Sequence, residues 1–252
     1  MLLHDFCAHL ETYFTDLHFD DCSNNGLQVE ASTEVTKVAF AVDACQATFQ
    51  QAAAVGAELL VVHHGLSWGS GVRRFKGCIG WRLAELFRNG VSLYACHLPF
   101  DAHPTLGNNA GLAAMLGLQD PQPFFQYGGG LIGLYGGLAA PASLEALANI
   151  LNRKLPTTCR LFPIEKQGLV SRIGVVSGGG ADAIPECQEL GLDCLVTGEM
   201  EHKFYHEARE SGIAVIAGGH YATETVGVKL VMQRIQADLG LECVFLDAPT
   251  GM

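Results

Sequence analysis

The sequence predicts an α/β protein with two similar lobes, each built from a mixed β-sheet flanked by helices. Three observations favour this fold class: an internal repeat, a βαβ pattern in each copy of the repeat, and the composition. Of the 252 residues, 49% are hydrophobic and 16% are charged, a balance typical of a compact chain with a buried core. Length alone allows one large domain or two small ones, so the repeat decides the organisation.

The first part of the repeat pairs two segments of similar pattern. They are "VAFAVDACQATFQQAAAVGAELLVVHHG", which begins at Val38, and "SRIGVVSGGGADAIPECQELGLDCLVTGE", which begins at Ser171. Each segment is typical of a strand, a helix that ends at a glycine, and a second apolar strand. The spacing from Asp43 to His63 equals the spacing from Ser177 to Thr197. Equal spacing in both copies predicts one βαβ unit in each lobe, with both faces of the sheet covered.

The repeat continues with a further helix and strand in each copy, at residues 83–101 and 204–224. This alignment places His97 opposite His220 and Asp101 opposite Glu224. Helices expected at residues 2–14 and 143–155 precede the two copies. The segment 119–130, "QDPQPFFQYGGG", carries Pro and Gly breakers and is the expected junction. We therefore expect a first lobe at 1–125 and a second at 126–252.

Charge and cysteine usage exclude several classes of protein. The chain has 15 basic and 26 acidic residues, a net charge of −11, which disfavours broad binding of nucleic acid. No apolar run reaches the roughly 20 residues of a membrane helix, and the N-terminus lacks the basic start of a signal peptide. Nine cysteines without a C-x-x-C motif are typical of scattered thiols in a reducing compartment, so we expect a cytoplasmic protein.

Three predicted strand ends carry side chains that bind metals. The apolar run Leu59–Val62 leads into His63 and His64. The two later strand ends are followed by "HLPFD", with His97 and Asp101, and by "HYATE", with His220 and Glu224. Functional residues of open α/β sheets gather at the carboxyl ends of strands.

The residue types at these ends predict a site for two divalent ions. Adjacent histidines on a strand are expected to diverge, so that each would serve a different ion. In a helical "HYATE" segment, His220 and Glu224 would share one face. The expected ligands are His63, His64, Asp101, His220 and Glu224, a donor set that suits Fe, Mn, Zn or Co. Glu224 could bridge the ions and act as a base, which would suit hydrolysis by metal-activated water.

Other interpretations stay open. A histidine at a strand end is more often a hydrogen-bonded core or rim residue than a ligand. His97 could bind an ion or could instead hold a ligand in its orientation. The site would be asymmetric, because the second copy has Thr197 and Gly198 in place of the paired histidines. A protein that binds metal without catalysis, as a scaffold or in metal handling, is the alternative to a hydrolase.

Five motifs resemble those of YbgI-like proteins, known as GTP cyclohydrolase 1 type 2 homologs. They are "SNNGLQVE", "VVHHG", "HLPFD", "VTGE" and "GGHYATE", in that order along the whole chain. The resemblance implies two α/β lobes, a dinuclear metal centre with the five ligands above, and a ring-shaped homohexamer. It also implies a small-molecule substrate, possibly a nucleotide, whose ring or cyclic amidine or amide bond is opened. One departure is the bulky Leu98–Phe100 run beside Asp101, which affects substrate access rather than metal binding.

Two loops remain as weaker candidates. The first copy carries about eleven extra residues after His64, and this loop holds Arg73, Arg74 and Lys76. Arginine binds phosphate through two parallel hydrogen bonds, so the loop could hold a substrate phosphate; a solvated basic loop is the alternative. The stretch "SGGGAD", residues 177–182, lacks the lysine of a phosphate-binding loop, and a tight turn is expected there.

Overall fold

The computed structural model describes residues 1–252, and the chain forms two compact units. The first unit contains residues 1–100 and 228–248, and the second contains residues 101–227 and 249–252. This division differs from the predicted boundary between residues 125 and 126. Residues 101–125 belong to the second unit, whereas the segment 228–248 returns to the first.

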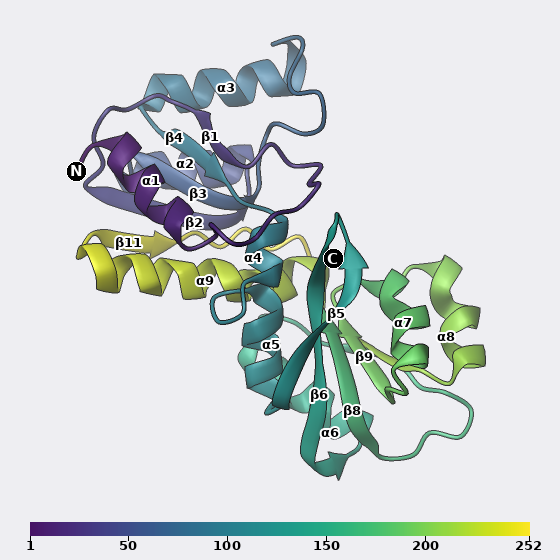
Figure 1. Cartoon of the computed structure of the whole chain (residues 1–252). Helices are drawn as coiled ribbons and strands as arrows, with labels where there is room; N and C mark the ends of the chain where they lie inside the picture. Colours follow the sequence, from purple (N-terminus) through teal and green to yellow (C-terminus); the bar gives the residue numbers. More distant parts are fainter. The chain divides into compact units, whose positions relative to one another are not determined.

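The sheet of the first unit has five strands in the order β1-β4-β3-β2-β11 (Figure 1). The strands are β1 (Gly26–Val29), β2 (Lys37–Asp43), β3 (Leu59–His64), β4 (Ser92–Ala95) and β11 (Glu242–Phe245). β1 pairs antiparallel with β4, and all the other neighbours are parallel. The sheet is therefore mixed, as the sequence predicts.

Helices flank this sheet. They are α1 (Leu3–Thr12), α2 (Gln46–Ala54) and α3 (Gly77–Asn89). Two more helices belong to both units: α4 (Leu98–Ala102) begins in the first unit and ends in the second, and α9 (His220–Leu239) begins in the second and ends in the first. Leu60 and Val62 of β3 lie in one buried apolar cluster with Phe49 of α2 and Leu86 of α3. Because side chains alternate along a strand, His63 points to the opposite face of the sheet.

The sheet of the second unit has six strands in the order β5-β6-β8-β9-β10-β7; β5, β6, β8 and β9 are labelled in Figure 1. The strands are β5 (Gln119–Tyr127), β6 (Gly130–Ala142), β7 (Arg160–Phe162), β8 (Val170–Val176), β9 (Cys194–Thr197) and β10 (Ala214–Ala217). β8, β9 and β10 are parallel, and the outer pairs are antiparallel. The parallel trio matches β2, β3 and β4 of the first unit, which agrees with the repeat.

Helices lie on both sides of the second sheet (Figure 1). They are α5 (Asn108–Leu116), α6 (Leu144–Lys154), α7 (Ile184–Glu189) and α8 (Tyr205–Ser211), with short 3₁₀ turns at Ala181–Ala183 and His202–Phe204. The Ser143 hydroxyl accepts a hydrogen bond from the Ala146 N–H and caps α6. The helices predicted at 2–14 and 143–155 are thus present as α1 and α6.

The segment 119–130, which the sequence predicts as the junction between the lobes, has regular structure. It forms β5 and the turn at Gly128 and Gly129 that leads into β6. Pro121 and Pro123 are tolerated because β5 is at the edge of the sheet, where a missing N–H donor leaves no neighbouring strand unpaired. None of the helices combines the length and the hydrophobicity needed to span a lipid bilayer.

Candidate metal centre

Three imidazoles come together at the carboxyl end of the first unit's parallel strands. β3 ends at His64, and His97 follows the end of β4. The ring centroids of His63 and His64 are 4.6 Å apart, and His97 lies 5.0 Å and 5.6 Å from them. One nitrogen from each ring lies within 4.8 Å of the other two. The two adjacent histidines therefore do not diverge as expected, because β3 ends there and both rings approach His97.

Two of these imidazoles are oriented by carboxylates. The Nδ1 atom of His64 is 2.9 Å from an oxygen of Asp43, and the Nδ1 atom of His97 is 2.8 Å from an oxygen of Asp21. An ionised carboxylate only accepts hydrogen bonds, so Nδ1 carries the proton and Nε2 becomes the atom that can bind a metal. Metal-binding histidines commonly have this arrangement.

Asp21 is ionised in this setting. Burial by itself raises the pKa of Asp21, but hydrogen bonds from His97 and from the Ser23 backbone outweigh it and lower the pKa to about 2. Asp21 also accepts hydrogen bonds from the backbone N–H of Leu98 and from the Asn25 amide. Asn25 in turn accepts a bond from the backbone N–H of His97. The asparagine turn of "SNNGLQVE" thus fixes the position of the His97 segment.

The second unit holds Asp101 by a buried polar network. One carboxylate oxygen of Asp101 accepts hydrogen bonds from the Asn108 amide and from the Ser177 hydroxyl, each at 2.8 Å. Asn108 is fully buried and also accepts a bond from the backbone N–H of Gly227. Asn109 accepts the backbone N–H of Ser177. Both bonds fix the orientation of the Asp101 carboxylate.

His220 and Glu224 lie one turn apart at the start of α9. The Nε2 atom of His220 is 3.0 Å from a carboxylate oxygen of Glu224, and its Nδ1 atom is 2.8 Å from an oxygen of Glu199. The helical geometry predicted for "HYATE" is therefore present. Burial lowers the pKa of His220, but the bonds and charges of Glu224 and Glu199 outweigh it and raise the pKa to about 9.

The carboxylates of this unit come close together around a glycine. Oxygens of Asp101 and Glu224 lie within 4.8 Å of one another. Gly178 has a φ of 61°, and a Cβ atom there would collide with the Glu224 carboxylate. Only glycine combines this backbone conformation with so close an approach. The expected tight turn at "SGGGAD" is therefore present, and it makes room for Glu224.

The predicted ligands thus form two sets, one within each unit. In the first unit His63 and His64 lie beside His97, which was not among the expected ligands; in the second, Glu224 lies close to both Asp101 and His220. The basic loop residues behave differently. Arg73, Arg74 and Lys76 lie in an irregular, exposed segment before α3.

Sequence reasoning missed the carboxylates and polar groups that hold the ligands. These are Asp21, Asp43, Ser177 and Glu199, with Asn108 behind Asp101. The repeat contained a signal for two of them, because Asp43 and Ser177 occupy equivalent positions at the ends of β2 and β8. Each holds a predicted ligand in its own unit. A cysteine nucleophile is disfavoured in the second unit, since burial raises the pKa of Cys187 to about 12.

Comparisons with known proteins agree with this architecture. A family model described as Duf34/NIF3 (NGG1p interacting factor 3) matches residues 1–251. The chain belongs to the Duf34/NIF3 family. A GTP cyclohydrolase 1 type 2 homolog from Pyrococcus abyssi is 42% identical to this chain, with 98% of each chain covered.

Solved structures extend the likeness to the fold. A protein described as ybgI, of unknown function, has 31% identity and a TM-score of 0.92, with both chains fully covered. The protein TTHA1606 from Thermus thermophilus has 37% identity and a TM-score of 0.90, again over the whole of both chains. The resemblance to YbgI-like proteins and the α/β fold class are therefore confirmed. The name of the Pyrococcus abyssi relative describes a homolog of a cyclohydrolase rather than a cyclohydrolase itself.

Proposed function

We propose that this Duf34/NIF3 protein binds two divalent metal ions through His63, His64, Asp101, His220 and Glu224 and is a hydrolase of the GTP cyclohydrolase type. The observation that carries the proposal is the pairing of imidazoles with carboxylates. Three histidines have their Nδ1 atom at hydrogen-bonding distance from a carboxylate oxygen: His64 with Asp43, His97 with Asp21, and His220 with Glu199. In the two proposed ligands of this group, His64 and His220, the pair leaves Nε2 as the nitrogen available to a metal, an arrangement common in metal-binding histidines.

The donor set fits first-row divalent ions. Imidazole nitrogens with carboxylate oxygens suit Fe, Mn, Zn or Co, whereas Mg and Ca prefer oxygen alone. Two such ions would supply a hydrolytic nucleophile from water at neutral pH and would stabilise charge that develops on the substrate. Two ions carry +4 against −2 from Asp101 and Glu224, which leaves room for an anionic substrate.

The proposal takes the five residues as ligands of one dinuclear centre. Covalent continuity supports this, because Asp101 directly follows Phe100 on α4. The Phe100 ring stacks on the His63 ring with 6.3 Å between centroids. A single peptide bond therefore joins Phe100, whose ring packs on the proposed ligand His63, to the proposed ligand Asp101.

Within the proposed centre, the chain's own residues have separate tasks. Glu224 would bridge the ions and accept a proton. Its side chain is buried beside His220, which supports a strong interaction between these two side chains. We assign His97 the task of orienting its neighbours: the Nδ1 bond to Asp21 fixes its ring, and that ring contacts the ring of His63.

The substrate that we propose has a nucleotide ring or a cyclic amidine or amide bond, in line with the relatives' name. A phosphate role for Arg73, Arg74 and Lys76 stays a prediction. Replacing both arginines by alanine is expected to raise the KM of a phosphorylated substrate far more than that of its unphosphorylated counterpart. Equal effects on both substrates would discard that role.

The assembly and the location remain predictions. A ring-shaped homohexamer in the cytoplasm is expected from the resemblance and from the cysteine usage. Light scattering coupled to gel filtration measures the assembly directly. A mass of one or two chains at micromolar concentration would contradict the ring.

The proposed function is tested by metal loading followed by turnover. Protein loaded with Fe(II), Mn(II) or Zn(II) is analysed for metal content and then given a panel of nucleotides and cyclic amides. We expect two ions per chain and hydrolysis of at least one compound. His64→Ala should lose bound metal and activity, whereas His206→Ala, on exposed α8, should lose neither.

Two results would count against the proposal in different ways. Fewer than two ions per chain at saturation would overturn the dinuclear centre. Two fully bound ions without turnover across the panel would favour the alternative, a metal-binding scaffold or a protein of metal handling.

A further inference from the structure

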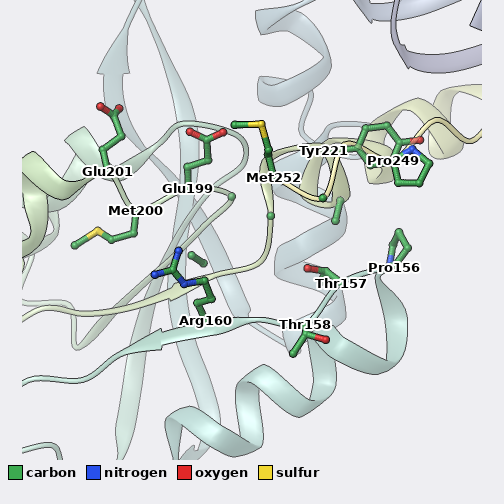
Figure 2. Close-up of a pocket in the computed structure, with 15 residues that line it drawn as sticks. Pro156, Thr157, Thr158, Arg160, Glu199, Met200, Glu201, Tyr221, Pro249 and Met252 are labelled. Carbon is green, nitrogen blue, oxygen red and sulfur yellow. The ribbon is translucent and has the colours of Figure 1, made fainter. Parts of the chain in front are cut away.

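A cavity of about 850 Å³ lies within the second unit (Figure 2). Its lining includes the residues that follow β9 and β10, so it opens at the carboxyl ends of parallel strands, where α/β proteins bind small molecules. The volume falls in the range of about 300–1,000 Å³ that is typical of such sites. A ligand the size of a nucleotide would fit.

The cavity shares a residue with the candidate centre of the same unit. Glu199 lines the cavity and also accepts the Nδ1 hydrogen bond of His220 at 2.8 Å. Tyr221, which follows His220 on α9, lines the cavity as well. A molecule bound here would therefore lie next to the residues that hold His220 in place.

Of the charged side chains that line the cavity, the two glutamates have ionic partners and the arginine does not. Glu199 is bonded to His220, and Glu201 forms an ion pair with Lys203 at 2.9 Å. Arg160 pairs with no carboxylate and packs over the ring of Phe162 at 5.2 Å. Figure 2 shows its guanidinium pointing from β7 into the cavity. Among the charged side chains of the lining, the one without an ionic partner is thus positive, and it favours an anion.

The rest of the lining suits a flat apolar group. Met200, Met252, Tyr221 and Pro249 contribute apolar surface (Figure 2). Methionine side chains are flexible and polarizable, so they adapt to ring systems of different shape. The hydroxyls of Thr157 and Thr158 add hydrogen-bonding capacity near Arg160.

We propose that this cavity binds a nucleotide-sized organic anion, with its phosphate or carboxylate at Arg160 and its flat body among Met200, Tyr221 and Met252. The inference rests on the proposed function insofar as this anion is the substrate of the adjacent centre. Arg160 then selects anionic over neutral molecules, and it does so independently of the exposed basic loop before α3.

The test compares anionic and neutral ligands of equal shape by equilibrium titration of the full chain. The first pair is GMP and guanosine, and the second is nicotinate and nicotinamide. We expect the anion of at least one pair to bind about tenfold tighter or more. The pair that shows the difference tells phosphate from carboxylate.

Matched variants locate the effect. Arg160→Ala should abolish the preference for the anion. Arg209→Ala should keep it, because Arg209 also packs over an aromatic ring of this unit but lies outside the cavity. Thr158→Trp fills the cavity from an exposed position and should remove binding of both members of the pair.

Each remaining outcome overturns the inference. These outcomes are equal affinity within both pairs, an anion preference that survives Arg160→Ala, and unchanged binding to the Thr158→Trp protein. Titration requires no turnover, so its result is separate from that of the proposed function. Binding that depends on Arg160 without hydrolysis would refute only the hydrolase, and hydrolysis with an unchanged KM in Arg160→Ala would refute only this inference.

Discussion

At the scale of single residues, the candidate centre depends on polar side chains that fix the orientation of the candidate ligands. His64, His97 and His220 each have a carboxylate on Nδ1, and Asp101 has two donors on one oxygen. Such partners fix the tautomer of an imidazole and the orientation of a carboxylate before any ion binds. Changes to the supporting residues should therefore weaken the centre without removing a ligand.

Asp43→Asn tests this support for His64. The amide keeps the shape of the side chain but lacks the negative charge that holds the Nδ1 proton. We expect the affinity for Zn(II) or Mn(II) to fall about 10- to 100-fold, measured by competition with a chromogenic chelator. Asp16→Asn, at an exposed position, is the control. An affinity equal to that of the wild type would show that Asp43 does not support a ligand.

Asn108→Ala tests the network around Asp101. The substitution removes a donor from a buried carboxylate and an acceptor from the backbone N–H of Gly227. We expect the free energy of unfolding to fall by about 3 kcal/mol, measured by urea denaturation. Asn89→Ala, on the exposed end of α3, should change it by about 0.5 kcal/mol or less. A small effect at Asn108 would mean that the network contributes little to stability.

At the scale of elements, strand ends deliver the functional residues. β2, β3 and β4 end beside Asp43, His64 and His97, and β8 ends beside Ser177. The starts of β2 and β3 are tied by a different group, Glu58. Its carboxylate accepts hydrogen bonds from the backbone N–H groups of Thr36 and Lys37, and from the Thr36 hydroxyl.

These bonds make stability depend on pH. Burial by itself raises the pKa of Glu58, but the bonds from Lys37 and Thr36 outweigh it and lower the pKa below its usual 4.5. A lowered pKa in the folded state stabilises the fold above pH 4.5, and this contribution is lost as the pH falls through the folded-state value. Glu58→Gln should therefore be less stable than the wild type at pH 7.

The difference between the wild type and Glu58→Gln should shrink as the pH falls below about 4.5. Urea denaturation at a series of pH values measures it. Glu34→Gln, at an exposed position, should show no such trend. A difference that stays constant down to pH 2 would contradict the role of the Glu58 charge.

At the scale of the whole molecule, the chain does not divide at one point. α9 begins in the second unit and continues into the first, and β11 then pairs in parallel with β2. A fragment that stops at residue 125 therefore lacks an edge strand and a helix of the first unit. Its β2 would expose unpaired backbone groups.

We expect the fragment 1–125 to unfold without a cooperative transition or to aggregate. A chain that joins residues 1–100 to residues 228–248 through a short flexible linker should unfold cooperatively. Circular dichroism during urea denaturation distinguishes the two results. A cooperative transition for the fragment 1–125 would restore the boundary that the sequence predicts.

Much of the fold followed from sequence patterns. Regular spacing of apolar runs and glycines predicted the two mixed sheets, and the four-residue spacing of His220 and Glu224 predicted their contact on α9. These features depend on local geometry, in which periodicity and capping decide the outcome. The Pro and Gly breakers of the expected junction at 119–130 did not indicate a strand, because an edge strand such as β5 tolerates the prolines that a central strand would exclude.

The sequence by itself therefore determined the fold class, the family and the strand ends at which candidate ligands occur. Only the tertiary structure decided which carboxylate orients each imidazole, that neighbouring His63 and His64 approach one another, and that the second unit encloses a cavity beside Arg160. Asp21 and His97 show why: their bond joins residues far apart in the chain, and no local pattern specifies such a pair. It exists because the folded backbone brings both segments to the same edge of the sheet.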